Sequence, residues 1–252
     1  MLEAASLDGA VNGVEAVIHL VGIISEVGES TFENVHVRGT GNIVTATRQA
    51  GATRFVHMSA LGTRPNAVSR YHQTKWVAED IVRQSGLDFT IFRPSLIYGP
   101  QDQFINLFAR MIRFSPVVLL MGSPRARFQP VPVEVVATAF VRSLGQPKSI
   151  GQTYDLCGPD ALTLSEIVDQ LMDVLQRRRL KIRVPLGLAR CQAAFLEFVF
   201  RRLLRKAPPL TGDQLIMLQE DNVGDPQPAN RLFGLKPLAF RDGIAGYLRR
   251  ET

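Results

Sequence analysis

The 252-residue sequence contains only two cysteines and no long apolar run. Cys157 and Cys191 form neither a CxxC pair nor the spacing of a Cys/His metal site, so we expect a reducing compartment, no disulfide framework and no metal centre. No stretch reaches the roughly 18 to 20 apolar residues that cross a bilayer, and the first residues do not resemble a signal peptide. We therefore predict a cytoplasmic protein that lies at most at the periphery of the inner membrane.

No strong excess of one charge runs through the chain. The 29 Lys and Arg residues outnumber the 23 Asp and Glu residues modestly, for a formal net charge of +6, and the excess is concentrated at residues 176–206. Such a basic region suits phosphates, anionic lipid or an acidic partner, and it is equally typical of a solvated helix face. We expect no nucleic-acid partner.

Short apolar runs alternate with helical segments over the first 100 residues. The runs at residues 14–22, 54–59 and 88–94 are typical of strands that are buried on both faces. Helices are predicted between them at residues 31–50 and 71–85, and each is followed by a glycine, Gly51 or Gly86. This order predicts right-handed crossovers and a doubly wound, parallel, Rossmann-like sheet of the α/β class.

The pattern changes after Pro100. The elements expected there are helices at residues 103–113 and 133–144 and strands at 117–121, 127–131 and 153–156. Thr163 and Glu166 have the spacing of a capping box for a helix at residues 164–175. The remainder is expected to be helical, at residues 186–206, 211–220 and 241–250.

Ser59 ends a predicted strand, and Tyr71 and Lys75 lie at the start of the next helix. A spacing of four residues places Tyr71 and Lys75 on one helical face. In a hydride-transfer site the ammonium lowers the pKa of the phenol and binds the nicotinamide ribose, the phenol exchanges a proton with the substrate, and the serine orients that substrate. A YxxxK sequence alone is weak evidence, because both residues are common on helix surfaces.

Four segments in this order resemble the extended and atypical short-chain dehydrogenase/reductases, in the superfamily of NAD-dependent epimerases and dehydratases. These segments are HLVG at residues 19–22, an NxxGTxN…AGxxRFV-like stretch at 34–56, YHQTK at 71–75 and RPSLIYGP at 93–100. The resemblance implies a dinucleotide site formed by His19, Leu20, Val21 and Gly22 on the adenosine side, by Ser59, Tyr71 and Lys75 at the nicotinamide ribose, and by Pro94, Ser95 and Ile97 at the nicotinamide ring. As an alternative, His19 only ends a strand, and Ser59 is as readily structural as functional.

No GxxGxxG turn precedes residue 14, where this family binds the pyrophosphate. The opening residues instead resemble a later segment of the family, so we expect an N-terminally truncated fold and weakened binding of NAD or NADP, of which we favour NADP. Residues 1–150 would form a partial NAD(P)-binding Rossmann-like domain. Residues 151–252 would form a smaller, mostly helical part for substrate or partner, interleaved with the first.

The C-terminal half resembles bacterial relatives of the nucleotide-binding accessory subunit of respiratory complex I. The resemblance rests on segments at residues 154–171, 184–199 and 233–237, and above all on PPLTGDQLIMLQEDNV at 208–223. It implies a dinucleotide-binding accessory or redox-sensing protein with a respiratory complex or a membrane surface as partner. The alternatives are an active NAD(P)-dependent oxidoreductase or epimerase on a nucleotide sugar or other carbonyl compound, and a docking module without a cofactor. The oligomeric state is left open.

Overall fold

A computed structural model describes residues 2–3, 6–204 and 206–249. Within these residues the central sheet has four strands, in the order β1 (Ala16–His19), β2 (Arg54–Met58), β3 (Asp88–Pro94) and β8 (Gln152–Leu156). All neighbouring strands in it are parallel. The predicted α/β class with a parallel sheet is confirmed.

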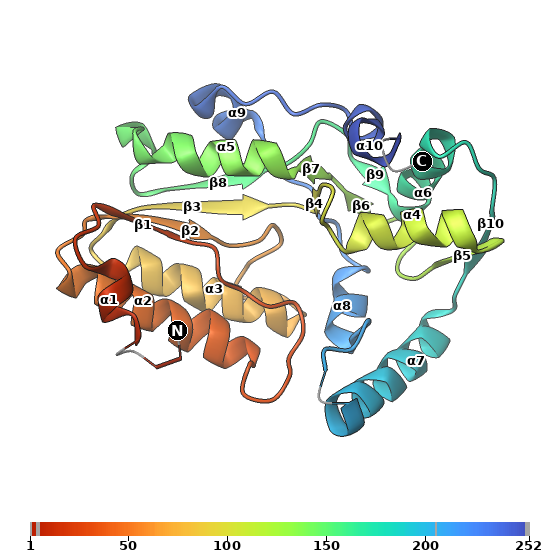
Figure 1. The fold of residues 1–252 in the computed structure, drawn as a ribbon, viewed down its shortest axis with the longest axis horizontal. Helices are drawn as coiled ribbons and strands as arrows, with labels where there is room; N and C mark the ends of the chain where they lie inside the picture. The colour runs from red at the N-terminus through yellow and green to blue at the C-terminus, as the bar shows by residue number, and fades with distance from the viewer. Residues whose placement is uncertain (1, 4–5, 205, 250–252) are drawn as a thin grey trace.

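Helices cover both faces of this sheet (Figure 1). The helices on one face are α1 (Asp8–Val11), α2 (Gly39–Gln49) and α3 (Arg70–Arg83), and those on the other are α5 (Val133–Leu144) and α9 (Gln227–Phe233). Strand residues alternate between the two layers, since Phe55 belongs to the core beneath α2 and α3 and Val56 to the core beneath α5 and α9. Both faces of β2 are therefore apolar and buried, as expected of an inner strand in a sheet with helices on both sides.

The predicted helix at residues 31–50 has two parts. It begins as a π-helix, η2 (Glu33–Arg38), and continues without a break into α2. His36 is buried within the π-helical part. Wide π-turns of this kind occur frequently at functional positions.

A second core lies beyond the carboxyl edge of the sheet, on the right of Figure 1. The helices that surround it are α4 (Phe104–Phe114), α6 (Leu164–Val174) and α10 (Phe240–Leu248). The predicted capping box of Thr163 and Glu166 is confirmed at the start of α6. Both of its hydrogen bonds are present, so this helix begins where the sequence predicts.

Strand β10 (Leu180–Arg183) corrects the expectation that only helices follow residue 164. It pairs in parallel with β5 (Val117–Leu120), and the backbone N–H of Leu180 donates to the carbonyl of Pro116 at 3.1 Å. A four-residue strand has too little pattern to be recognised alone. It becomes a strand by pairing with β5, in which Leu180 is in register with Val117, 63 residues earlier in the chain.

The predicted strand at residues 127–131 is wrong as one strand. Gln129 and Pro130 separate β6 (Arg127–Phe128), which pairs antiparallel with β9 (Leu162–Thr163), from β7 (Val131–Pro132), which pairs parallel with β4 (Ile97–Tyr98). The two halves therefore belong to different ladders, and a proline between them has no N–H to donate to either. Helix α9 was not expected, and a short 3₁₀ helix, η3 (Pro147–Ser149), precedes β8.

The predicted helix at residues 186–206 corresponds to α7 (Leu186–Phe198) followed by the π-helix η4 (Val199–Leu204). Helix α8 (Gly212–Met217) is shorter than the predicted 211–220. Figure 1 shows α7 extending away from the central sheet. Arg205 and Arg250, at the ends of two predicted helices, lie outside the described residues. Among the described residues, no helix combines the length and the hydropathy needed to cross a membrane.

Candidate dinucleotide site

The carboxyl ends of the parallel strands bring the predicted cofactor residues to one edge of the sheet. His19 is the last residue of β1, Ser59 follows β2, and Pro94 is the last residue of β3. Leu20 and Val21 leave the sheet at this edge with 50% and 47% of their surface exposed. Ligands of open parallel sheets bind in the crevice outside the carboxyl ends of the strands, so these residues lie where a dinucleotide would be bound.

Lys75 is the most unusual residue at this edge. Its side chain is 2% exposed, and its ammonium donates a hydrogen bond to the carbonyl of Met58 at 2.9 Å. An ammonium has three N–H donors, and the Met58 carbonyl is the acceptor recorded for it within the described residues. Burial lowers the pKa of Lys75 to about 8, although the nearby carboxylate of Glu79 opposes this shift.

Gly22 brings the backbone of the HLVG segment against this ammonium. A Cβ atom at position 22 would lie 3.1 Å from Nζ of Lys75 and 3.6 Å from Nε2 of His36. The glycine therefore allows the loop backbone to approach the ammonium more closely than a residue with a side chain could. The spare N–H groups of Lys75 could donate to a ribose hydroxyl, so the donor chemistry fits the sugar of a dinucleotide.

Tyr71 lies in the first turn of α3, and aromatic rings surround it. Its ring makes edge-on contacts with those of Phe32, His36 and His72, at centroid distances of 5.9, 5.3 and 5.3 Å. Burial raises the pKa of Tyr71 to about 12. The lowering of the phenol's pKa expected from Lys75 is thus not found, because desolvation of the phenolate dominates.

Ser59 is buried, and its hydroxyl is 3.4 Å from that of Thr63, within hydrogen-bond range. Its backbone N–H donates to the carbonyl of Phe92 at 2.7 Å. Ser95, on the loop after β3, donates from its hydroxyl to the carbonyl of Asn222 at 3.1 Å. Both serines are engaged in holding loops at this edge, and Ile97 pairs with Val131 in the β4–β7 ladder.

Three buried histidines lie near Lys75. Nδ1 of His19 and Nδ1 of His57 are 3.0 Å apart, so one ring donates to the other. Burial, together with the positive charge of Lys75, lowers the pKa of His19 to about 4 and that of His36 to about 3, and that of His57 falls well below its usual range. All three imidazoles are therefore neutral at pH 7.

His36 connects the HLVG loop to the helix that carries Lys75. The backbone N–H of Ile23 donates to Nε2 of His36 at 3.1 Å, and Nδ1 of His36 is 2.9 Å from the hydroxyl of Thr74. Nε2 of His36 also lies 3.1 Å from the carbonyl of Ile23, so the ring contacts both backbone groups of that residue. The sequence analysis missed His36 and Thr74, and only the position of Thr74 beside Lys75 could have indicated them.

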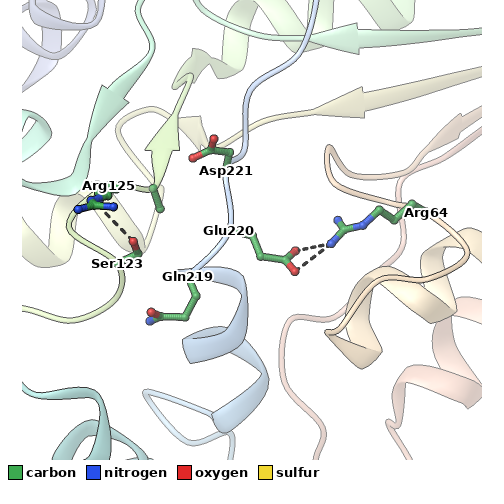
Figure 2. A pocket seen from close by; sticks show the side chains of 7 residues that line it. Arg64, Ser123, Arg125, Gln219, Glu220 and Asp221 are labelled. Atoms are coloured by element: carbon green, nitrogen blue, oxygen red, sulfur yellow. Dashed lines mark hydrogen bonds and ion pairs between the residues drawn. The ribbon is translucent and has the colours of Figure 1, made fainter.

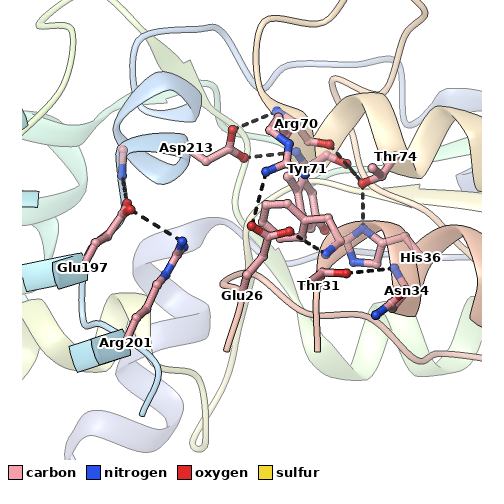
Figure 3. Close-up of polar contacts among 12 residues, drawn as sticks. Glu26, Thr31, Asn34, His36, Arg70, Tyr71, Thr74, Glu197, Arg201 and Asp213 are labelled. Carbon is pink, nitrogen blue, oxygen red and sulfur yellow. Dashed lines mark hydrogen bonds and ion pairs between the residues drawn. The ribbon is translucent and has the colours of Figure 1, made fainter. Parts of the chain in front are cut away.

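Asp213 fixes the N-terminus of α3. Its carboxylate accepts from the backbone N–H groups of Arg70 at 2.7 Å and Tyr71 at 3.0 Å (Figure 3). These are donors that a helix cannot satisfy internally, and a negative charge there complements the helix dipole. Asp213 belongs to the PPLTGDQ segment, so the structure gives that segment a physical role: α8 holds the helix of Tyr71 and Lys75.

Asn222, near the end of the same segment, joins two loops at the carboxyl edge. Its carbonyl accepts from the hydroxyl of Ser95, and its side-chain amide donates to the carbonyl of Leu61 at 3.1 Å. The loops after β2 and β3 are thus tied to the C-terminal part of the chain. The sequence analysis recognised this segment as distinctive without assigning a role to Asp213 or Asn222.

Comparisons with known proteins relate this chain to proteins that bind NAD(P)H. The sequence profile of a family described as NAD(P)H-binding matches residues 1–106. The chain is 29% identical over 222 residues to NADH dehydrogenase (ubiquinone) 1 alpha subcomplex subunit 9, mitochondrial, of Arabidopsis thaliana, with 86% of this chain and 54% of that protein covered. It is 32% identical over 182 residues to a ceramide reductase of Caulobacter vibrioides, covering 71% of this chain and 56% of that protein. The chain therefore contains an NAD(P)-binding domain, and its relatives include a subunit of complex I.

Solved structures with the same fold extend this result. The chain matches UDP-glucose 4-epimerase with UDP-glucose from Thermotoga maritima with a TM-score of 0.75 and 16% identity, over 99% of this chain and 82% of that one. At this identity the likeness shows the fold alone. The predicted resemblance to the accessory subunit of complex I is confirmed by the Arabidopsis relative, and the chain spans about half the length of the curated relatives it matches.

A polar pocket of about 490 Å³ lies beyond the loop after β2 (Figure 2). Its lining residues are Arg64, Ser123, Arg125, Ala126, Gln219, Glu220 and Asp221. Arg64 forms an ion pair with Glu220 at 2.9 Å across one side. Two guanidinium groups and two carboxylates line this pocket, so a ligand would have to be polar or charged.

Proposed function

We propose that this chain binds a nicotinamide dinucleotide, with NADP(H) favoured, and holds it without turnover as an accessory or redox-sensing protein. The observation that carries the proposal is the buried ammonium of Lys75, which has spare N–H donors and lies close to the backbone of Gly22. A buried cation without a carboxylate in hydrogen-bond contact is costly to fold around. Such a residue is typical of a site built for a ligand.

The raised pKa of Tyr71 supports the absence of turnover. A bound nicotinamide would supply hydride chemistry, and a tyrosine in that role must exchange a proton near neutral pH. The Tyr71 phenol, with a pKa of about 12, stays protonated, and its ring is packed among Phe32, His36 and His72. This environment favours a structural role for the phenol.

The test uses the full chain and titrates it with NADPH and NADH, measured by calorimetry. We expect saturable NADPH binding that falls at least tenfold in Lys75→Met, as loss of a charge-assisted hydrogen bond predicts. The matched control is Lys148→Met, since Lys148 is exposed, and it should bind as the wild type does. Failure of both dinucleotides to bind overturns the proposal, and so does unchanged NADPH affinity in Lys75→Met.

An active oxidoreductase or epimerase on a nucleotide sugar or other carbonyl compound is the second candidate. The polar pocket with Arg64 and Arg125 favours it, because guanidinium groups suit phosphate and carboxylate oxygens. In this scheme Tyr71 is the acid/base, Lys75 its electrostatic partner and Ser59 the residue that orients the substrate. Steady dinucleotide oxidation with a carbonyl substrate, lost in Tyr71→Phe, would select this function over the first.

For the partner, we propose a respiratory complex or the membrane surface beside it. The support is the name of the Arabidopsis relative, a mitochondrial NADH dehydrogenase subunit, and the basic C-terminal region of this chain. Membrane fractions of the native source, washed with and without salt, test this location. We expect the protein to sediment with membranes at low salt and to be released at high salt.

A further inference from the structure

Helix α7 buries one side and exposes the other. Ala189 and Ala193 are fully buried and pack near Leu215 of α8. The large exposed side chains are Leu188 (63%), Phe195 (66%) and Phe198 (62%). Spacings of seven and ten residues place these three on one side of the helix. α7 therefore presents an apolar stripe on the part of the molecule that extends away from the sheet (Figure 1).

The strand that leads into α7 has the same character. Leu180 pairs with Val117 and Ile182 pairs with Leu119, and paired residues two positions apart along parallel strands point to the same side. Leu180 is 64% exposed and Ile182 is 42% exposed, so this side faces solvent. We call the exposed apolar side chains of β10 and α7 the α7 surface, made up of Leu180, Ile182, Leu188, Phe195 and Phe198.

The stretch of chain that carries the α7 surface contains many more basic residues than acidic ones. Residues 177–206 contain ten Lys and Arg residues and a single carboxylate, Glu197. Arg177, Arg183, Arg190 and Arg202 are exposed. Glu197 is itself engaged, because it accepts from the backbone N–H of Gly212 at 2.6 Å and pairs with Arg201 at 3.7 Å (Figure 3). Two more of the ten basic residues pair with carboxylates of α6, Arg178 with Asp173 at 3.2 Å and Lys181 with Asp169 at 2.7 Å. The remaining basic residues leave a positive local charge beside the exposed apolar stripe.

We infer that the α7 surface binds directly to an anionic lipid bilayer, with its apolar side chains in the boundary between headgroups and acyl chains and its arginines on lipid phosphates. This combination of apolar stripe and basic flanks is that of helices which lie in the plane of a membrane interface. Each Lys or Arg near an anionic surface adds to the attraction. The inference deepens the peripheral location proposed above, and it does not depend on dinucleotide binding.

The α7 surface also ends close to the dinucleotide site. Glu197 of α7 accepts from Gly212 at the start of α8, and the next residue, Asp213, caps α3. A membrane bound to α7 would thus be connected to the helix of Tyr71 and Lys75 through the hydrogen bond of Glu197 with Gly212 and those of Asp213 with α3 (Figure 3). The bound lipid surface would hold the crevice at the carboxyl edge in a defined orientation to the membrane.

Vesicle flotation with purified full-length protein tests the inference. The probes are vesicles of phosphatidylcholine alone and vesicles of phosphatidylcholine mixed with phosphatidylglycerol. The variants are the apolar pair Phe195→Gln with Phe198→Gln and the charge pair Arg190→Glu with Arg202→Glu. The matched controls are Val141→Gln, an exposed apolar residue on α5, and Arg231→Glu, an exposed arginine on α9.

We expect the wild type and both controls to float with the anionic vesicles only, and to be released by salt. Each variant pair should bind on the order of tenfold or more weakly, with unchanged NADPH affinity. Wild type that does not float with anionic vesicles overturns the inference. Flotation of both variant pairs at wild-type strength also overturns it. So does binding to native membranes that retain their proteins but not to vesicles of lipid alone, which would favour an acidic protein partner. A loss of NADPH binding in the wild type would instead count against the proposed function alone.

Discussion

Replacing Lys75 with methionine tests whether the buried ammonium is retained for a ligand at the expense of stability. Methionine has nearly the same length and shape but no charge. The pKa of Lys75 falls from 10.5 to about 8, which corresponds to about 3 kcal/mol by which the folded protein disfavours the charged form. The substitution also removes the hydrogen bond to the carbonyl of Met58, and this loss offsets about 1 kcal/mol of the gain in stability. We therefore expect Lys75→Met to raise the free energy of unfolding by about 2 kcal/mol at pH 7.

The pH dependence of this gain follows from the direction of the pKa shift. Below pH 8 the lysine is protonated in both the folded and the unfolded state, so the full penalty is present. Between pH 8 and 10.5 the folded state loses the proton while the unfolded state keeps it, and the wild type becomes more stable as the pH rises. The advantage of Lys75→Met should therefore shrink across this interval.

Urea unfolding followed by the fluorescence of Trp76, the single tryptophan of the chain, measures both quantities. Trp76 lies on α3 beside Lys75, so it reports on the same helix. The control Lys148→Met, at an exposed position, should change the free energy of unfolding by less than about 0.5 kcal/mol. A lower stability of Lys75→Met at pH 7, or a difference independent of pH up to 10.5, would refute the reasoning.

Three further substitutions test particular contacts. Gly22→Ala should weaken NADPH binding several-fold with little loss of stability, because its methyl group would press on the buried ammonium 3.1 Å away; calorimetry measures the affinity. Asp213→Ala should lower the free energy of unfolding by about 1 to 2 kcal/mol, since it removes the acceptor of the Arg70 and Tyr71 N–H groups and leaves Ser69 as the side-chain cap; hydrogen exchange should increase in the first turn of α3. Gly243→Ala should cost about 1 to 3 kcal/mol in urea unfolding, because the added methyl group overlaps the hydroxyl of buried Tyr98; Gly246→Ala on the same helix has open space and should be neutral or stabilising.

The proposal that the chain binds a dinucleotide without turnover depends on an environment of Tyr71 that the sequence does not reveal. YxxxK predicts the right helix and the right face for Lys75, and α3 begins within one residue of the expected start. It does not predict that Tyr71 would be packed against Phe32 and His36, which belong to a different helix. The pKa of the phenol rises because of that packing, so the chemistry implied by the motif and the chemistry supported by the site differ.

The sequence by itself determined the layered α/β fold, the parallel order of β1, β2 and β3 and the start of α6. These features depend on the spacing of apolar side chains and on capping residues, which act over a few neighbouring positions. Only the tertiary structure decided that β10 is a strand, that residues 127–131 belong to two ladders, and that Asp213 caps a helix beginning at Arg70, 143 residues earlier in the chain. Pairing, capping and burial between distant segments depend on which groups the fold brings together, and no local pattern records that.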